Sequence, residues 1–283
     1  MSCRLTRKAS LVGDLHMHSN RSDGSLDLEK MFFIAAKSEL DFLSITDHNF
    51  LSSSSELFEL GKKYGIKPIN GVELSCYDTE RKRKVHILCY CFVDYEVLMP
   101  VCERASKIRK EIGKITAEYV AKHFIVPPSL IEKYKSKSGV IYQQNLVHAL
   151  IDCGYCNSVY GELYDSLSSK NLKIETETDL DVKFVVNLIH KAGGKAVMAH
   201  PFVYDSIDLL NELIEEKLID GIEVWHPKNS KQQQQILLSL VKKNDLIATG
   251  GTDFHGFYSS CYLVRIGDFC TPEAHLNKLL QTN

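Results

Sequence analysis

Short apolar runs alternate with amphipathic stretches along most of the chain. Apolar runs rich in β-branched residues predict strands over residues 11–16, 41–46, 67–73, 84–92, 195–199, 221–225 and 246–250. Apolar positions three and four residues apart predict helices over residues 28–40, 52–65, 179–194, 206–216 and 231–243. Thr271 and Pro272 supply an N-cap and a first-turn proline for a closing helix. Strands that alternate with helices predict parallel pairing in βα units.

The pattern changes between residues 95 and 177. Glycines thin out there, and helical spacing runs through Ile108, Ile112 and Ile115. Pro127 and Pro128 interrupt the spacing, and residues 129–132 have the form of a capping box that starts another helix. We therefore expect an α/β fold in which residues 10–94 and 178–283 form a distorted (β/α) barrel. Residues 95–177 would be a helical insertion that covers the site and selects the substrate.

Acidic and histidine side chains gather where the predicted strands end. Residues two apart in an extended segment point the same way, so His16 and His18 can face one ion while Met17 turns away. Asp253 and His255 repeat this spacing near the end of the chain. The candidate metal ligands are His16, His18, Asp23, His48, Glu73, His86, His200, Asp253 and His255. One such pair could be ordinary rim residues, but nine ligands in this arrangement indicate a multinuclear metal site in a hydrolase.

The ligand types indicate the metal and the chemistry. Six imidazoles with three carboxylates favour Mn, Fe or Zn, whereas an oxygen-only set would favour Mg or Ca. Two ions about 3.5–4 Å apart can share and deprotonate a water, and the resulting metal-bridged hydroxide is a nucleophile near neutral pH. Because ligand histidines must be neutral, activity should fall at acidic pH.

Other polar residues near the predicted strand ends allow two interpretations. Asp47 either orients the His48 imidazole or acts as a buried cap. His226 follows a predicted strand, and is either a site residue, as a proton donor or phosphate contact, or structural. We take His226 and Asp253 as the candidate catalytic residues. The histidines without a partner motif are expected to be surface or capping residues: His123, His148, His190 and His275.

The net charge, the length of apolar stretches and the cysteine count limit the classes of partner and the cellular compartment. The net charge is −2, so the chain has no strong positive electrostatic field that would attract long nucleic acid. No apolar stretch is long enough for a membrane span. The basic first residues are not followed by an apolar region, and an odd number of cysteines (nine) is typical of reduced thiols. We expect a cytoplasmic protein that does not bind long nucleic acid or a membrane.

The order of the motifs resembles that of the PHP (polymerase and histidinol phosphatase) phosphoesterases. The motifs are His16-Met17-His18, Thr46-Asp47-His48, Glu73, His86, Ala199-His200-Pro201 and Asp253-Phe254-His255. The chain length and the place of the insertion are most similar to stand-alone bacterial members that act on nucleotides or short RNA ends. The resemblance implies a distorted seven-stranded β/α barrel, two to three divalent ions, and attack of the metal-activated hydroxide on phosphorus. It also implies a small phosphorylated substrate, possibly a nucleotide or a short oligonucleotide.

The resemblance also implies how the ligands divide. A first ion would be held by His16, His18, Glu73 and Asp253. Glu73 would bridge to a second ion, completed by His86 and His200. A third ion would take Asp23, His48 and His255, and the position of Asp23 is a histidine in some relatives.

The insertion departs from the nucleotide-cleaving pattern. Those relatives use an arginine here to hold a phosphate, whereas Gly139–His148 contains none. Basic side chains on the first insertion helix are the substitutes, and Arg104, Arg109 and Lys110 are the candidate substrate-binding residues, although a solvated basic face is the competing interpretation. The alternatives to a small-molecule phosphoesterase are a 5′-end exonuclease on short RNA or DNA, a histidinol-phosphate phosphatase, and a metal-binding accessory module without activity.

Overall fold

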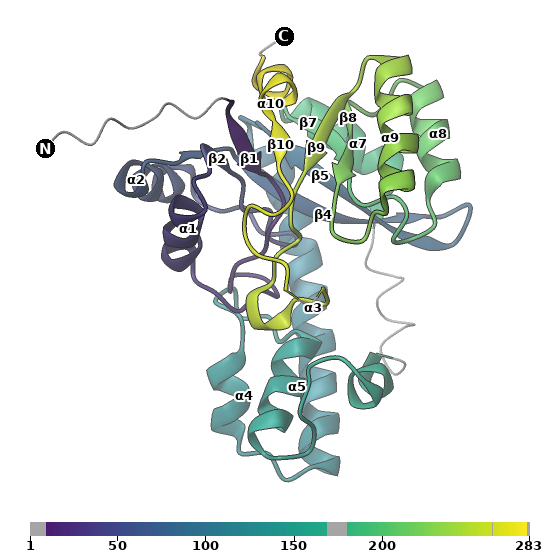
Figure 1. Ribbon diagram of the computed structural model, residues 1–283. Helices are drawn as coiled ribbons and strands as arrows, with labels where there is room; N and C mark the ends of the chain where they lie inside the picture. The colour runs from purple at the N-terminus through teal and green to yellow at the C-terminus, as the bar shows by residue number, and fades with distance from the viewer. Residues whose placement is uncertain (1–9, 169–179, 262, 282–283) are drawn as a thin grey trace, which may run out of the picture.

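The computed structural model describes residues 10–168, 180–261 and 263–281, which form a mixed α/β body with a helical extension (Figure 1). Two sheets have the strand orders β10-β1-β2-β3 and β6-β4-β5-β7-β8-β9. The strands are β1 (Val12–Asp14), β2 (Phe42–Leu43), β3 (Lys67–Pro68), β4 (Gly71–Asp78), β5 (Arg83–Tyr90), β6 (Leu180–Asp181), β7 (Lys195–Met198), β8 (Gly221–Trp225), β9 (Ile247–Gly250) and β10 (Thr271–Pro272).

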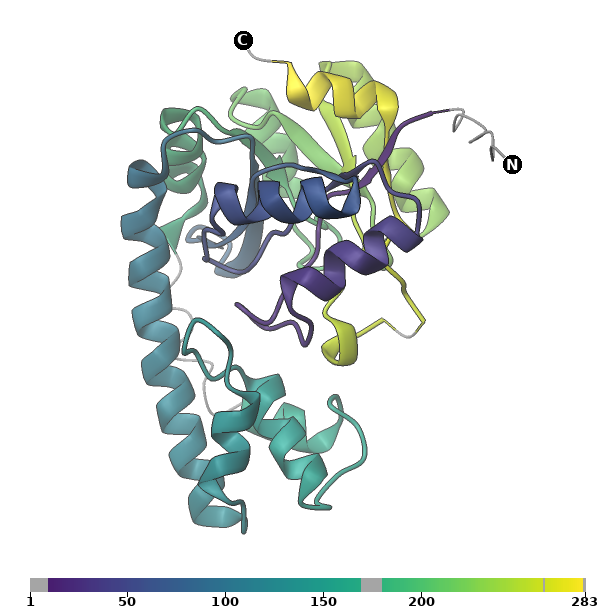
Figure 2. The same ribbon diagram turned by 90° about the vertical axis from the view of Figure 1, so that its left-hand side faces the viewer.

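Helices pack on the sheets and build the extension. Those of the main body are α1 (Leu28–Lys37), α2 (Ser54–Tyr64), α7 (Val182–Lys191), α8 (Ile207–Glu215), α9 (Lys231–Asn244), α10 (Glu273–Leu280) and the 3₁₀ turn η1 (Gly256–Tyr258). Those of the insertion are α3 (Tyr95–His123), α4 (Pro128–Tyr134) and α5 (Gln143–Asp152). Figure 2 shows α3 running from the main body to the far end of the extension. None of the described helices combines the length and the apolar character that a bilayer crossing requires.

The strand pairing corrects the expectation of parallel βα units throughout. Strands β7, β8 and β9 are parallel neighbours, as are β1, β2 and β3. However, β5 is antiparallel to both β4 and β7. The reason is local, because only a short turn separates β4 from β5, and a short turn permits an antiparallel hairpin but no parallel crossover. Strand β4 also runs to Asp78, five residues beyond the predicted strand end at Glu73.

The strand pairing of the described residues agrees with a mixed α/β fold but shows neither closure of the distorted barrel nor the seven strands that the resemblance implies. The described residues make two separate sheets, which are linked by isolated parallel bridges between Met17 and Phe254 and between His48 and Glu73. The ladders of β1, β2, β7 and β9 stop just before the segments that carry ligands, whereas Glu73 and His86 lie within the β4–β5 ladder. The overall architecture is therefore a mixed α/β fold whose two sheets meet at the site.

Separate apolar cores support the main body and the insertion. The largest core lies between the six-stranded sheet and α7, α8 and α9, and includes Ile87, Val186 and Leu210. The insertion has a core of its own around Val120 and Leu146. Helix α3 joins the two, because its first turns reach the main core and its last turns reach the insertion core. The predicted boundary at 177/178 lies outside the described residues.

The capping residues predicted at helix starts are correct at one helix and wrong at two others. Asp181 caps α7 by accepting hydrogen bonds from the backbone of Lys183 and Phe184. The capping box predicted at residues 129–132 is wrong, because α4 already begins at Pro128, where a proline fits the first turn. The closing helix α10 likewise begins after Pro272, since Thr271 pairs with β1 instead of capping.

Candidate metal centre

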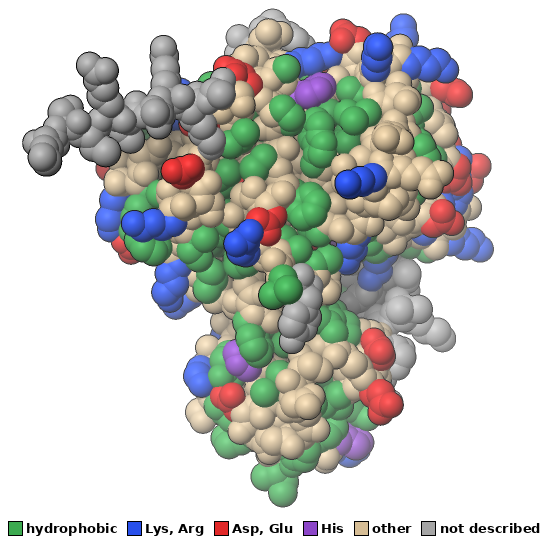
Figure 3. All heavy atoms as spheres, in the orientation of Figure 1, with side chains coloured by type: hydrophobic (Ala, Val, Ile, Leu, Met, Phe, Trp, Pro, Cys, Tyr) green, Lys and Arg blue, Asp and Glu red, His purple; other side chains and the backbone are tan. Residues whose placement is uncertain are grey.

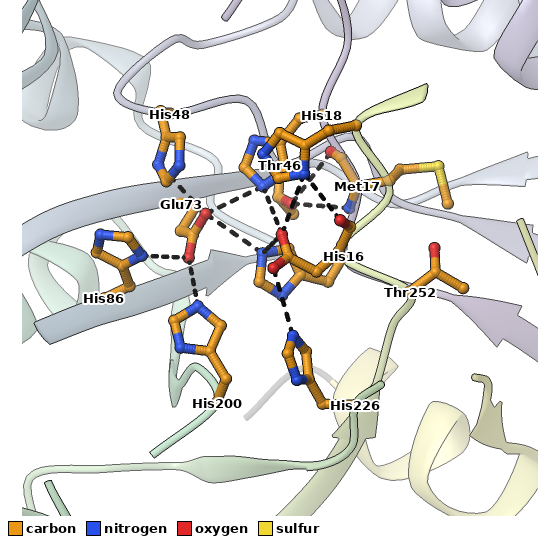
Figure 4. Close-up of polar contacts among 12 residues, drawn as sticks. His16, Met17, His18, Thr46, His48, Glu73, His86, His200, His226 and Thr252 are labelled. Atoms are coloured by element: carbon orange, nitrogen blue, oxygen red, sulfur yellow. Dashed lines mark hydrogen bonds and ion pairs between the residues drawn. The ribbon is translucent and has the colours of Figure 1, made fainter. Parts of the chain in front are cut away.

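The His16-Met17-His18 segment is extended and held on both sides. The backbone N–H of Thr46 donates to Met17 O (2.9 Å), and that of Asp253 donates to His16 O (2.8 Å). A Cβ at Gly251 would collide with the backbone of His16, so only glycine allows the segment after β9 to approach this closely. Met17 is buried in the core, which leaves both imidazoles directed into the site (Figure 4).

Glu73 lies in the middle of the imidazoles and divides them between its two oxygens (Figure 4). Oε1 lies 2.8 Å from His86 Nδ1 and 3.1 Å from His200 Nε2. Oε2 lies 3.1–3.2 Å from ring nitrogens of three further histidines, which are His16, His18 and His48. The side chain is 1% exposed. A carboxylate in this position can bridge two cations, one on each oxygen.

Asp253 and Asp23 complete the cluster on the side of His18. Asp253 Oδ1 lies 3.5 Å from His16 Nε2 and 3.3 Å from His18 Nε2. Asp23 Oδ1 lies 3.5 Å from His18 Nδ1 and 3.3 Å from His255 Nε2. The structure thus brings all nine sequence-predicted ligands together. The groups that could each hold an ion are His18/Asp23/His48/His255, His16/His18/Asp253, His16/Glu73/His200 and His48/Glu73/His86.

Unpartnered polar atoms show that this cluster suits cations. Within the described part of the chain, eight of the eleven buried side-chain nitrogen and oxygen atoms without a hydrogen-bond partner belong to these ligands. Each buried polar atom left in this state costs about 1–3 kcal/mol. Imidazole nitrogens and carboxylate oxygens are the donors that divalent transition metals prefer. The residues therefore fit a metal cluster.

Glu223, which the sequence analysis did not single out, positions two ligands from behind. Its Oε1 lies 2.7 Å from His16 Nδ1, and its Oε2 accepts a hydrogen bond from the backbone of His200 (2.9 Å). A carboxylate on the rear nitrogen of an imidazole fixes the ring orientation and leaves the other nitrogen free for metal. The available signal was an acid inside an otherwise apolar strand, β8, which is buried over most of its length.

His226 is a positioning partner of Asp253 in this geometry. Its Nδ1 accepts a hydrogen bond from the backbone N–H of Lys228 (3.2 Å). In the neutral ring the proton is then on Nε2, which lies 3.4 Å from Asp253 Oδ2. The His226 side chain is fully buried. It therefore acts on Asp253 and does not face the cavity beside the cluster.

Asp47 acts as a buried cap, the second of the two roles considered for it. It accepts hydrogen bonds from the backbone and the hydroxyl of Ser19 (2.8 and 2.6 Å), and from the Ser22 hydroxyl. These bonds fix the loop that carries Asp23.

Two ligands adopt left-handed backbone angles, at φ 23° for His200 and 47° for Asp253. Such strain persists only where the surroundings impose it, as they do at functional sites.

The carboxylates and imidazoles of the cluster shift one another's pKa values. Burial opposes the charged form of His18, but Asp253 and Glu73 outweigh it and raise the His18 pKa to about 10. Burial likewise opposes the charge on His16, yet Glu223 and Glu73 hold the pKa of His16 well above its ordinary value. Burial lowers the pKa of His48. Against their own burial, the surrounding imidazoles hold the pKa values of Glu73 and Asp253 well below the ordinary range.

A cavity of ≈ 200 Å³ opens beside the cluster and reaches the insertion. Asp23, His48 and His86 line it, as does Arg109 of α3. Lys84 also lines it, two residues before His86 on β5, a spacing of two that the sequence analysis overlooked. Tyr142 lines the cavity as well. The Cζ atom of the Arg109 guanidinium lies over the Tyr142 ring, 6.0 Å from the ring centroid.

The other two candidate substrate-binding residues lie elsewhere. Arg104 is exposed and is not among the residues that line the cavity, and Lys110 lines a different hollow between α3 and the loop after His48. Successive helical residues are 100° apart, so Arg104, Arg109 and Lys110 cannot all face one cavity.

The remaining histidines have identifiable partners. His190 Nε2 lies 2.8 Å from Asp220, and His275 Nδ1 accepts a hydrogen bond from the backbone of Ala248. His123 Nδ1 lies 2.8 Å from the carbonyl oxygen of Tyr119, one turn earlier. His148 differs from the surface role expected for it, because it joins the insertion to η1 through Tyr258.

Comparison with known proteins adds three findings. A model of the PHP domain matches residues 14–224. The phosphoribosyl 1,2-cyclic phosphate 1,2-diphosphodiesterase of Eggerthella lenta is 32% identical over 250 residues, which cover 87% of this chain and 95% of that protein. The 5′-3′ exoribonuclease of Escherichia coli is 26% identical over 258 residues, with 87% and 86% covered.

The fold is also shared with a solved structure. A protein from Bifidobacterium adolescentis, assigned as a metal-dependent phosphoesterase, superposes with a TM-score of 0.79 at 22% identity. The superposition covers 96% of each chain, so the arrangement of both sheets and the insertion has a counterpart there.

Proposed function

Because the chain belongs to the PHP domain family of phosphoesterases, we propose that it hydrolyses a phosphate ester of a small ribose phosphate or nucleotide that carries a second phosphate group. The observation that carries this proposal is the cavity beside the metal-competent cluster, lined by two cations, Arg109 and Lys84. One phosphate would lie against the cluster and the second against these cations. Arg104 and Lys110 would add positive charge on the same helix without touching the substrate.

The roles of the cluster residues follow from their contacts. Two to three divalent ions, of Mn, Fe or Zn, would supply Lewis-acid charge and activate water for attack on phosphorus. Glu73 offers one oxygen to each side of the cluster, and the surrounding imidazoles would hold the ions. Asp253 is the catalytic carboxylate, because Oδ1 faces the cluster while His226 holds Oδ2. In the overall reaction the P–O ester bond breaks, water oxygen bonds to phosphorus, and the leaving alcohol takes the proton.

The relatives support the substrate class. The Eggerthella lenta enzyme, at 32% identity, is named for a phosphoribosyl cyclic phosphate, which contains two phosphate groups. A substrate of this kind has one phosphate to be hydrolysed and another that can be recognised. The length of the match, 95% of that protein, includes the insertion that lines the cavity.

A second candidate is attack on the 5′ end of short RNA, which the similarity to the Escherichia coli exoribonuclease favours. Long polymers are disfavoured by charge, since backbone binding relies on many basic contacts. The face in Figure 3 shows basic and acidic side chains interspersed over the main body without a continuous basic surface. The net charge of −2 agrees with this.

A hydrolysis screen with Mn²⁺ would test the proposal if it follows both free phosphate and, by chromatography, the monoester that forms when a cyclic phosphate opens. We expect turnover of ribose bisphosphates, ribose cyclic phosphates or nucleoside bisphosphates, with little release from monophosphates such as histidinol phosphate. Preferential release of mononucleotides from short RNA would favour the exonuclease. A protein that binds metal and hydrolyses none of these esters would contradict the proposal and favour the accessory module.

Arg109 should act on substrate binding more than on chemistry. Charge-assisted hydrogen bonds contribute about 1.5–3 kcal/mol, so Arg109→Met should raise KM about 10–100-fold and change kcat less. Steady-state kinetics with the best substrate of the screen would measure both constants. Lys122→Met, which removes an exposed charge from the last turn of the same helix, is the matched control. An unchanged KM in Arg109→Met would remove this residue from the substrate site.

A further inference from the structure

The insertion reaches a metal-competent group directly, through Gln144 of α5. Its Nε2 donates a hydrogen bond to Asp23 Oδ2 at 3.1 Å, across 121 positions of sequence. Both side chains are buried, Gln144 at 8% and Asp23 at 6% exposure. We propose that Gln144 is a positioning residue for the ligand group His18/Asp23/His48/His255, and that the insertion thereby sets the affinity of that group for its ion. The inference rests on the proposed metal-dependent function.

The hydrogen bond fixes which oxygen of Asp23 faces His18 and His255, while His48 Nε2 lies 3.8 Å from Oδ2. With Oδ2 bound to Gln144, Oδ1 faces His255 Nε2 (3.3 Å) and His18 Nδ1 (3.5 Å). Oδ1 has no hydrogen-bond partner of its own. Without the amide, the carboxylate could rotate about its last bond, and the oxygen presented to the ion would no longer be fixed. Gln144 therefore holds Asp23 in its ligand orientation.

A second set of contacts holds the loop of His255 from the same side. The Tyr258 hydroxyl lies 2.9 Å from His148 Nδ1, and Tyr160 donates a hydrogen bond to the Tyr258 carbonyl oxygen (2.7 Å). The His148 ring also stacks on Phe257, at 4.6 Å between centroids. Tyr258 belongs to η1, which begins one residue after His255. The insertion thus supports two ligands of the same group.

The other side of the cluster is supported from within the main body. His16 and the backbone of His200 both bond to Glu223 of β8, and His226 holds Asp253. Asp23 and the loop of His255, which the insertion supports, therefore have other partners than His16, His200 and Asp253. A change in the insertion should weaken one ion and leave the ions held from β8 unaffected.

Metal titration of the stripped full-length chain tests this. Residues behind a metal ligand typically change metal affinity by about 10–100-fold. Gln144→Met keeps the length of the side chain and removes the donor, so we expect one of three Mn²⁺ equivalents to weaken by about 10–100-fold in calorimetry. The other two should keep their affinities. Asp23→Asn should weaken the same equivalent, and the double variant Asp23→Asn/Gln144→Met should add little, because the two residues act through one contact.

Gln143→Met is the matched control. Gln143 precedes Gln144 on α5, but its amide bonds within the insertion, to the Tyr164 carbonyl oxygen and to Ser168 Oγ. We expect it to leave all three equivalents unchanged. A uniform weakening of every equivalent in Gln144→Met, the same loss in Gln143→Met, full additivity with Asp23→Asn, or fewer than three equivalents in the unsubstituted chain would each overturn the inference. Selective loss in a chain that hydrolyses no phosphate ester would support the inference while removing the proposed function.

Discussion

Replacing Glu73 with glutamine should nearly abolish phosphate-ester hydrolysis. Glutamine keeps the size of the side chain but removes the negative charge that five imidazoles contact through its two oxygens. Metal charge at a reacting phosphate is worth several kcal/mol, and a loss of about 4 kcal/mol lowers the rate about 1000-fold. Because Glu73 serves both sides of the cluster, we also expect more than one metal equivalent to be lost.

Rates and metal content should be measured on the same samples. Elemental analysis after dialysis gives the bound equivalents, and phosphate release under saturating Mn²⁺ gives the rate. Glu56→Gln is the matched control, since Glu56 is an exposed carboxylate that pairs with Arg21 away from the cluster. A Glu73→Gln protein that retains its metal and more than a tenth of its rate would contradict the bridging role.

Mn²⁺ binding to the metal-free protein near neutral pH should release at least two protons. The carboxylates around His16 and His18 hold the pKa values of both imidazoles above neutrality, at about 10 for His18, so both rings carry protons at pH 6–7. A metal ligand must be a neutral imidazole, so each ring gives up its proton when the ion binds. Two coupled protons make the apparent binding constant fall about 100-fold for each unit that the pH is lowered.

Metal binding and the stability of the metal-free fold depend on pH in different ways. Raised histidine pKa values stabilise the metal-free fold below pH 6.5, and this contribution is lost as the pH rises through their folded values. The lowered pKa values of Glu73 and Asp253 stabilise the fold above about pH 4.5, and this contribution is lost as the pH falls through the folded values. Between these limits acid should therefore release metal before it unfolds the chain.

Calorimetry in buffers of different ionisation enthalpy would count the protons. Activity measured in parallel should fall from pH 7 to pH 5 and return on neutralisation with Mn²⁺. Circular dichroism over the same range is the control for folding. Release of fewer than one proton per chain, or a rate that stays constant down to about pH 4, would contradict the assignment of His16 and His18 as ligands.

Parts of the fold were predictable because their signals are local. Helices α1, α2, α7 and α9 follow from the spacing of apolar residues, since each buries one face on a sheet. Strands β7, β8 and β9 follow from short apolar runs bounded by polar turns. Strand pairing was less accessible, because it depends on contacts between segments far apart in the chain. The antiparallel β4–β5 hairpin and the two separate sheets are the result.

The side chains that gather at the centre could be identified from local rules alone. Two ligands spaced two apart must share a direction in an extended segment, and this local rule applies to His16 with His18 and to Asp253 with His255. What surrounds these ligands depends on contacts across the fold. Glu223 and Lys84 reach the site from β8 and β5, where an acid in an apolar strand and the spacing to His86 are only weak signals. Gln144 reaches it from α5, and no neighbouring motif marks that residue. The reason is physical: a metal ligand is marked by its own chemistry and spacing, whereas a residue that positions a ligand is defined only by a contact across the fold.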